Sequence, residues 1–92
     1  MEIEWMENSW AEYQYFLKRD KQTAQKIKSL IEDIILNGVD KGIGKPEALK
    51  HNYSGYYSRR IDRKNRLIYY VYNDGENDVL AIFSCTGHYD DK

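Results

Sequence analysis

The chain has 92 residues, of which 32% are charged and 41% hydrophobic, and its formal net charge is −1 at pH 7. This length predicts one domain, spanning residues 1–92, with a thin core, because so short a chain buries only about 60–65% of its unfolded surface. It leaves no room for a separate substrate domain or a nucleotide-binding unit.

Three features predict a cytoplasmic protein. The acidic segment at residues 1–5 lacks the apolar run of a secretory signal. The most apolar stretch, residues 30–36, is interrupted by Glu32 and Asp33, so we expect no membrane span. Cys85 is the only cysteine in the sequence, which excludes an internal disulfide and is typical of a reducing compartment.

The first half of the sequence predicts a short strand followed by two helices. Residues 2–5 favour a strand, and the segment from Ser9 to Glu12 fits a capping box that would start a helix at Ser9. A second helix is expected from Asp20 to the stop signal at residues 37–38. Its apolar residues recur at three- and four-residue steps and predict a core-facing stripe: Ala24, Ile27, Leu30, Ile31, Ile34 and Ile35.

The second half predicts a loop and three strands. The loop covers residues 38–50 and contains Pro46, the only proline. Strands are expected over residues 56–62, 67–72 and 79–85, joined by turns at residues 63–65 and 73–78. The resulting order, βααβββ, predicts an α+β fold in which two helices pack on one face of a small, mostly antiparallel sheet.

The positive charge is concentrated in one segment. Residues 45–70 hold seven basic and two acidic side chains, a net charge of +5, whereas residues 1–44 have a net charge of −2 and residues 71–92 of −4. A local positive field steers an anionic substrate more than the total charge does. Because the whole chain is not basic, this pattern favours a substrate presented by a larger assembly over free nucleic acid.

Polar side chains suited to phosphodiester chemistry lie in and beyond this segment. They comprise a carboxylate, an imidazole, a phenol and several cations: Glu47, His88, Tyr89, Lys50, Arg59, Arg60 and Arg66. One carboxylate, one imidazole and several guanidiniums suffice for metal-free RNA cleavage. A base takes the proton of the 2′-hydroxyl, an acid protonates the leaving oxygen, and cations hold the phosphate.

Each candidate also has a structural interpretation. Glu47 fits either a solvated loop carboxylate or a general base whose backbone is fixed by Pro46. Arg66 fits either a bidentate phosphate clamp or a salt bridge to Asp62 across the turn. Lys50 fits a further phosphate contact or a flexible solvated lysine.

The neighbouring arginines must differ in role. Arg59 and Arg60 are adjacent on a strand, so they point to opposite faces and only one can face the site. We assign Arg60 to the site and Arg59 to solvent, a partner or RNA.

His88 fits a surface residue or a general acid whose pKa is raised by Asp90 or by the scissile phosphate. Tyr89 fits an aromatic plug or a neutral hydrogen-bond donor.

Four segments occur in a diagnostic order: GKPEALK, SGYYSRRI, RLIYYV and a terminal His-Tyr pair. With them, nearly the whole chain resembles the YoeB family of bacterial toxins, within the RelE/ParE superfamily. The resemblance implies a toxin that cleaves messenger RNA in the ribosomal A site. It also implies that Glu47 is the general base, His88 the general acid and Arg60 a functional arginine, with Tyr89 orienting the phosphate and the leaving group.

The resemblance also implies partners. Members of this family pair with a YefM-like antitoxin whose disordered acidic segment wraps the toxin, and many form homodimers. The +5 segment suits such an acidic partner. No helical histidine pair or Cys/His spacing supports a metal site, so we expect no cofactor.

Three features depart from the family pattern, and an alternative function is open beside the toxin interpretation. Thr86 and Gly87 precede His88, where the family commonly has a basic and an aromatic residue, the last hairpin turn is longer, and three residues follow Tyr89. The alternative is a non-catalytic inhibitor on the same fold that poisons DNA gyrase or blocks the ribosome. Such a binder needs no pairing of Glu47 with His88.

Overall fold

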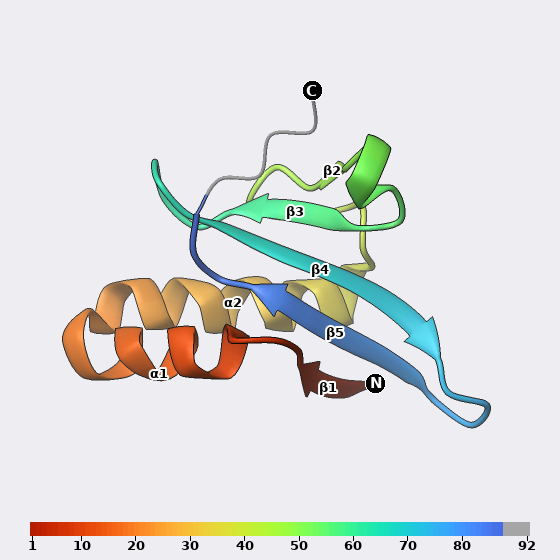
Figure 1. Ribbon diagram of the computed structural model, residues 1–92, viewed down its shortest axis with the longest axis horizontal. Helices are drawn as coiled ribbons and strands as arrows, with labels where there is room; N and C mark the ends of the chain where they lie inside the picture. Colours follow the sequence, from red (N-terminus) through yellow and green to blue (C-terminus); the bar gives the residue numbers. More distant parts are fainter. Residues whose placement is uncertain (88–92) are drawn as a thin grey trace.

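The computed structural model describes residues 1–87, which form two helices and a five-stranded sheet (Figure 1). The helices are α1 (Ser9–Arg19) and α2 (Lys21–Asn37), and a single 3₁₀ turn, η1, covers His51–Tyr53. The strands are β1 (Glu2–Trp5), β2 (Glu47–Ala48), β3 (Tyr57–Arg60), β4 (Arg66–Asn73) and β5 (Asp78–Ser84).

The strands lie in the order β1-β5-β4-β3-β2. β1 pairs with β5 in parallel, and the other neighbours pair antiparallel. Both helices cover the same face of this sheet (Figure 1). The predicted α+β architecture is therefore confirmed, with β2 as an additional strand inside the segment expected to be a loop.

Both helices begin where the sequence predicted, α1 at Ser9 and α2 directly after Asp20, but only the second has the predicted cap. The Asp20 carboxylate accepts hydrogen bonds from the backbone N–H of Thr23 at 3.1 Å and from its hydroxyl at 2.7 Å, which caps α2. The capping box expected for α1 was wrong. The Ser9 hydroxyl donates instead to the carbonyl of Ile82, and Glu12 accepts from the backbone N–H of Cys85, so these side chains tie α1 to β5 and to the residue that follows it.

The main core lies between the helices and the sheet. α2 contributes five of the six residues of the predicted stripe, whereas Ile35 is 41% exposed and was assigned wrongly. The sheet contributes Leu67 and Tyr69 from β4 and Leu80 and Ile82 from β5. Strand alternation therefore turns the intervening residues toward the other face, which we call the open face.

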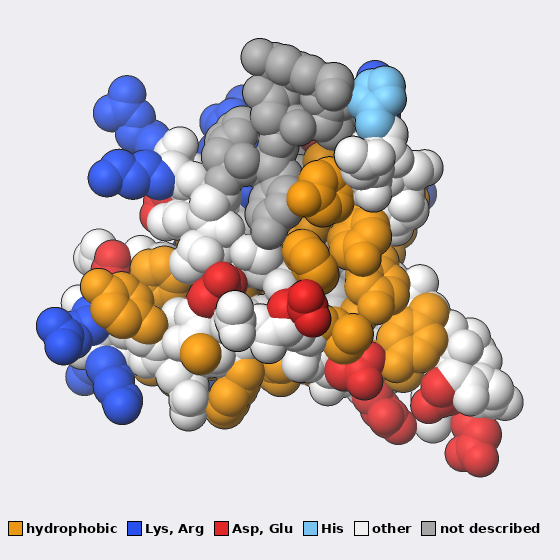
Figure 2. Space-filling view, viewed as in Figure 1, with side chains coloured by type: hydrophobic (Ala, Val, Ile, Leu, Met, Phe, Trp, Pro, Cys, Tyr) orange, Lys and Arg blue, Asp and Glu red, His pale blue; other side chains and the backbone are white. Residues whose placement is uncertain are grey.

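Aromatic rings pack on one part of the open face. The Tyr56 ring lies 5.0 Å from that of Tyr70 and 5.3 Å from that of Phe83, centroid to centroid, in edge-to-face contacts. In the space-filling view, hydrophobic side chains gather beside the β4 and β5 region, between the acidic lower-right end and the basic upper-left end (Figure 2). No helix within residues 1–87 is both long and apolar enough to cross a membrane.

Candidate active site on the open face of the sheet

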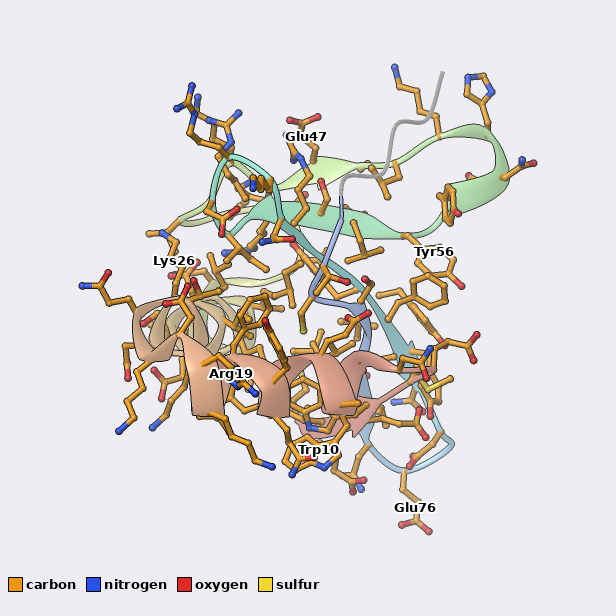
Figure 3. The ribbon with its side chains drawn as sticks, turned by 60° about the vertical axis from the view of Figure 1, so that its left-hand side comes forward. Trp10, Arg19, Lys26, Glu47, Tyr56 and Glu76 are labelled. Carbon is orange, nitrogen blue, oxygen red and sulfur yellow. The ribbon has the colours of Figure 1, made fainter. Side chains whose placement is uncertain are left out.

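Strand register places four polar side chains on the open face. Glu47 pairs with Ser58 across β2 and β3, and Arg60 pairs with Arg66 across β3 and β4. Residues directly opposite each other share a face, and Ser58 and Arg60 are two positions apart on one strand. Figure 3 shows Glu47 on the side of the sheet away from α1, which carries Trp10 and Arg19.

Arg66 connects these side chains. Its Nη1 donates a hydrogen bond to the Ser58 hydroxyl at 3.0 Å, and its Nη2 lies 3.9 Å from Oε1 of Glu47. The Arg66 side chain is 13% exposed, whereas that of Glu47 is 60% exposed. The cation is therefore held in place while the carboxylate remains open to a substrate.

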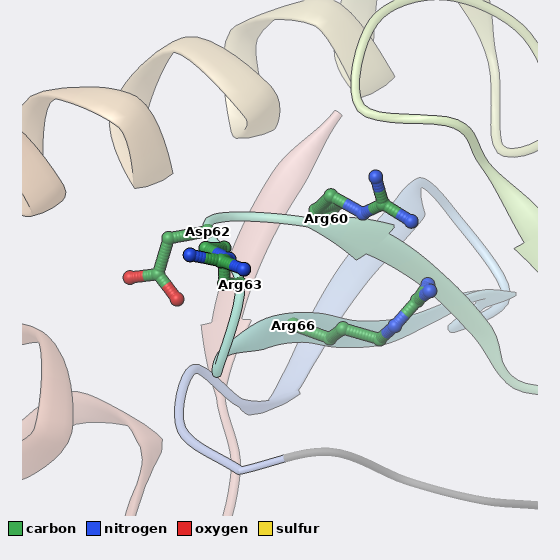
Figure 4. A pocket seen from close by; sticks show the side chains of 4 residues that line it. All are labelled: Arg60, Asp62, Arg63 and Arg66. Atoms are coloured by element: carbon green, nitrogen blue, oxygen red, sulfur yellow. The ribbon is translucent and has the colours of Figure 1, made fainter.

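A shallow hollow of about 240 Å³ lies beside this pair. Arg60, Asp62, Arg63 and Arg66 line it. Figure 4 shows Arg60 and Arg66 extending from β3 and β4, with Asp62 and Arg63 on the turn between the strands. Three guanidiniums around one open hollow form a site for an anion such as a phosphate group.

Asp62 shapes the turn and does not neutralise Arg66. Its carboxylate accepts hydrogen bonds from the backbone N–H groups of Lys64 and Asn65 at 2.8 and 2.7 Å and from the Asn65 amide at 3.2 Å. Burial raises the pKa of Asp62, but these hydrogen bonds outweigh it and hold the pKa below its ordinary value. Among residues 1–87, the carboxylate within 4 Å of Arg66 is that of Glu47, so the salt bridge considered above is not formed.

Arg59 is not at the surface, contrary to its assignment to solvent, a partner or RNA. Its side chain is fully buried on the helix side of the sheet. The guanidinium forms an ion pair with Asp33 and donates hydrogen bonds to the Tyr69 hydroxyl and to backbone carbonyls of the loop after α2. It is therefore unable to reach a phosphate. Alternation did predict that Arg59 and Arg60 would face opposite ways.

Lys50 is exposed and directly precedes η1, and it is not among the residues that line the hollow. Its backbone carbonyl accepts the N–H of Tyr53 at 3.0 Å, so its backbone is fixed while its side chain extends into solvent. The structure thus leaves its proposed phosphate contact a prediction.

Gly87, the last described residue, is hydrogen-bonded to the start of β4. The carbonyl of Gly87 accepts the backbone N–H of Arg66 at 3.0 Å, and the N–H of Gly87 donates to the side-chain oxygen of Asn65 at 3.0 Å. Residue 87 therefore lies beside the arginine that faces Glu47. The proposed acid His88 and its neighbour Tyr89 lie outside the described residues.

The sequence interpretation missed Ser58 and Asn65. Ser58 orients the guanidinium of Arg66, and Asn65 holds both the turn and Gly87. Strand alternation offered a signal for Ser58, since it lies two positions before Arg60 and must share its face. Within residues 1–87, no group of three or more His, Cys, Asp or Glu side chains is arranged to hold a metal ion.

Comparison with known proteins gives consistent results along the chain. A family model for the YoeB-like toxin of bacterial type II toxin–antitoxin systems matches residues 5–89. Toxin YoeB of Escherichia coli (strain K12) is 44% identical over 89 residues, covering 97% of this chain and 100% of the relative.

Solved structures show the same similarity. The heterotetrameric YoeB–YefM complex from Staphylococcus aureus matches with a TM-score of 0.85 at 43% identity, covering 97% of this chain and 98% of that chain. The YoeB dimer from Staphylococcus aureus matches with a TM-score of 0.86 at 42% identity, with the same coverage. The shared fold and sequence extend across the candidate site.

Proposed function

Because this chain belongs to the YoeB-like toxins of bacterial type II toxin–antitoxin systems, we propose that it is a ribosome-dependent endoribonuclease that cleaves messenger RNA in the A site. The observation that carries the proposal is the placement of Glu47 beside Arg66 on an open, cation-lined face. A carboxylate that faces a fixed guanidinium can accept a proton while the guanidinium holds the adjacent phosphate.

The proposed reaction is a transesterification in which the RNA supplies its own nucleophile. Glu47 takes the proton of the 2′-hydroxyl, and the 2′-oxygen attacks the adjacent phosphorus. Arg66 and Arg60, with Lys50, stabilise the negative charge that develops on the phosphate oxygens. The bond to the 5′-oxygen breaks as His88 gives that oxygen a proton, and Tyr89 helps to orient the leaving group.

The products follow from the bond that the 2′-oxygen forms to phosphorus and the bond to the 5′-oxygen that breaks. The upstream fragment ends in a 2′,3′-cyclic phosphate, and the downstream fragment begins with a 5′-hydroxyl. The proton taken by Glu47 and the proton given by His88 balance, so one turnover needs no added oxidant, reductant or cofactor. Water that later opens the cyclic phosphate yields a 3′-phosphate.

The shape and charge of the site support a substrate that the ribosome presents. The hollow is shallow and open, with only about 240 Å³, so it does not enclose a nucleotide by itself. The basic end of the molecule is opposed by an acidic end at the turn between β4 and β5 (Figure 2). A ribosome that holds the messenger in place supplies the orientation that this open site lacks.

The same exposed cations suit an antitoxin. Of the seven basic residues in segment 45–70, six remain at least partly exposed because only Arg59 is buried. We infer that a YefM-like antitoxin covers this surface with an acidic segment, as the assembly named for the Staphylococcus aureus relative supports. We also infer a homodimer of the free toxin, as the dimer named for that relative supports.

Primer extension on messenger bound to purified ribosomes tests the proposed function. The wild-type toxin is expected to produce a cut within the A-site codon that is absent when ribosomes are omitted. Intact messenger with arrested translation would contradict cleavage and identify a ribosome-blocking inhibitor. Intact messenger with normal translation would redirect the search to DNA gyrase, the target of binders on this fold.

A further inference from the structure

Arg59 is a fully buried cation next to the proposed site that takes no part in the proposed chemistry. Its Nη1 lies 2.5 Å from Oδ2 of Asp33 in α2, and its Nε donates to the Tyr69 hydroxyl at 2.9 Å. Its remaining donors are directed at the loop that follows α2. They reach the backbone carbonyls of Ile43 at 3.0 Å, Gly38 at 2.8 Å and Lys41 at 2.5 Å.

The other members of this cluster hold the same loop. Asp33 Oδ2 also accepts the backbone N–H of Ile43 at 3.0 Å, and the Tyr69 hydroxyl donates to the carbonyl of Val39 at 2.6 Å. We call Asp33, Arg59 and Tyr69 the loop clamp. Its side chains come from a helix and two strands, yet all three bond to the backbone of residues 38–43.

The loop is shaped closely around the clamp. A Cβ atom at Gly42 would lie 1.8 Å from Oδ2 of Asp33, and one at Gly44 would lie 2.7 Å from Cδ2 of Leu30. Both glycines also have positive φ, of 113° and 83°, which side-chain-bearing residues rarely adopt. A residue other than glycine at either position would be strained by its φ and would have to displace the side chain of Asp33 or Leu30.

The clamped loop leads directly into the proposed base. The carbonyl of Gly44 accepts the backbone N–H of Arg60 at 2.7 Å, and β2 begins at Glu47. Glu47 then pairs with Ser58, which is the residue before Arg59 and the hydrogen-bond partner of Arg66. The buried guanidinium of Arg59 thus holds the loop on the helix side of β3. Its neighbours along the strand, Ser58 and Arg60, face the site on the open face.

We propose that Arg59 is a positioning residue whose clamp on residues 38–43 holds Glu47 opposite Arg66. The effect of the clamp on cleavage rests on the proposed function. The ordering of the loop by the clamp rests on the contacts alone. β2 is only two residues long and lies at the edge of the sheet, where it pairs with β3 alone. Loss of the clamp therefore frees the segment that carries Glu47 while the core of the domain stays folded.

The test compares Asp33→Asn and Tyr69→Phe with Ile27→Val as a matched control. Asp33→Asn removes the charge that faces Arg59, and Tyr69→Phe removes the hydroxyl that bridges Arg59 and Val39. Ile27 is buried in the same helix as Asp33 but belongs to the core between helices and sheet, so its truncation lowers stability without touching the clamp. Arg59→Lys serves as a third variant if it folds, because the three donors of lysine lie on one nitrogen and cannot reach the acceptors that Nε, Nη1 and Nη2 of Arg59 contact.

Two readouts separate positioning from general stability. The first is the single-turnover cleavage rate at saturating toxin, together with the toxin concentration that gives half of that rate. Asp33→Asn and Tyr69→Phe are expected to lower the saturating rate about 10- to 100-fold with little change in the half-saturating concentration. The second is amide hydrogen exchange at Ile43, Arg60 and Leu49, whose N–H groups bond to Asp33, Gly44 and Tyr56.

The two readouts also distinguish this inference from the proposed function. The clamp is supported if Asp33→Asn and Tyr69→Phe show faster hydrogen exchange at all three amides and a lower saturating cleavage rate. The control Ile27→Val should show neither change. A wild-type rate in both clamp variants despite faster exchange at Ile43 would overturn the positioning role while leaving the nuclease intact. If the wild type cleaves nothing, the proposed function fails, and exchange at Leu49 still decides whether the clamp orders β2.

Discussion

Nη2 of Arg66 and Oε1 of Glu47 lie 3.9 Å apart on the open face, although the two residues belong to strands separated by β3. Ser58, on that intervening strand, pairs with Glu47 and accepts a hydrogen bond from Arg66. The middle strand therefore sets the spacing between the Glu47 carboxylate and the Arg66 guanidinium.

Replacing the carboxylate tests its role as a base. Glu47→Gln keeps the size of the side chain and is expected to lower ribosome-dependent cleavage by about 10²–10⁴-fold, the usual contribution of a general base. Fold and thermal stability are expected to stay unchanged because Glu47 is exposed. Glu76→Gln, on the exposed turn between β4 and β5 (Figure 3), is the matched control and should cleave at the wild-type rate.

Cleavage by Glu47→Gln at the wild-type rate would remove Glu47 from the mechanism. Binding to ribosomes by this variant, measured by co-sedimentation, is expected to match that of the wild type. A loss of binding as well as cleavage would instead assign Glu47 to recognition of the messenger.

Changes at Arg66 separate its charge from its geometry. Arg66→Ala is expected to lower the cleavage rate about 100-fold or more, as loss of a donor to a developing anion does. Arg66→Lys should retain part of the rate, because the charge remains but the bidentate fork is lost. Ser58→Ala, which removes the hydrogen bond that orients Arg66, should lower the rate by up to about tenfold.

Ser54→Ala is the control for Ser58→Ala, because Ser54 is exposed and lies in the loop after η1. Single-turnover cleavage on programmed ribosomes measures all four variants. Equal rates for Arg66→Lys and the wild type would mean that charge alone, without the fork, suffices at this position.

The loop clamp gives the protein a defined acid sensitivity. The Arg59 guanidinium, helped by the N–H of Ile43 and the amide of Asn37, holds the pKa of Asp33 below its ordinary value of 3.8. Ionised Asp33 therefore stabilises the folded state fully above that value, and this contribution is lost as the pH falls through the lower folded-state pKa. Asp33→Asn is expected to be less stable than the wild type at neutral pH, with the difference shrinking at about pH 3.

Denaturant unfolding at both pH values measures this change. Asp40→Asn removes the same charge from an exposed position in the same loop and should show no comparable difference. A stability gap between wild type and Asp33→Asn that is constant with pH would contradict the ion pair as its source.

Glu12 connects α1 to the segment that precedes His88. Its Oε1 accepts the N–H of Cys85 at 2.7 Å, and its Oε2 accepts the Thr86 hydroxyl at 2.9 Å. Glu12→Ala leaves these donors unpaired and is expected to cost about 1–3 kcal/mol of unfolding free energy. The same variant should expose the Cys85 thiol more often to a labelling reagent.

Thiol labelling at about pH 8 provides the measurement. Burial, with Glu12 nearby, raises the pKa of the Cys85 thiol to about 12, so the folded wild type should react only as fast as it opens. Glu7→Ala, in the exposed segment before α1, should label like the wild type. Rapid labelling of the folded wild type would contradict the anchored, buried position of this thiol.

The helices and the long strands follow from local patterns. The three- and four-residue spacing in α2 and the capping Asp20 are contained within one segment, so the sequence alone predicted them. The capping box at Ser9 and Glu12 failed because Ile82 in β5 and Cys85 just after it, far along the chain, offered these side chains other partners. Tertiary contacts overrode a local signal that was otherwise well formed.

The sequence identified residues of the candidate site better than it identified the contacts that hold them in place. Glu47 and Arg66 were selected by chemistry, and the register of β2, β3 and β4 brings them together. β2 was missed because two residues carry no periodicity. Arg59 was misassigned because its partners, Asp33 and the loop carbonyls, lie well before it in sequence and no local pattern marks an arginine for burial.

The most direct test of the account uses messenger with a single 2′-deoxy substitution at the nucleotide whose 2′-hydroxyl is the proposed nucleophile, bound in the ribosomal A site. Wild-type toxin should cut the unmodified messenger, leaving a 2′,3′-cyclic phosphate and a 5′-hydroxyl, and should leave the substituted messenger intact. Cleavage of the substituted messenger at an undiminished rate would show that another nucleophile attacks the phosphorus, and would contradict Glu47 as the base for the 2′-hydroxyl.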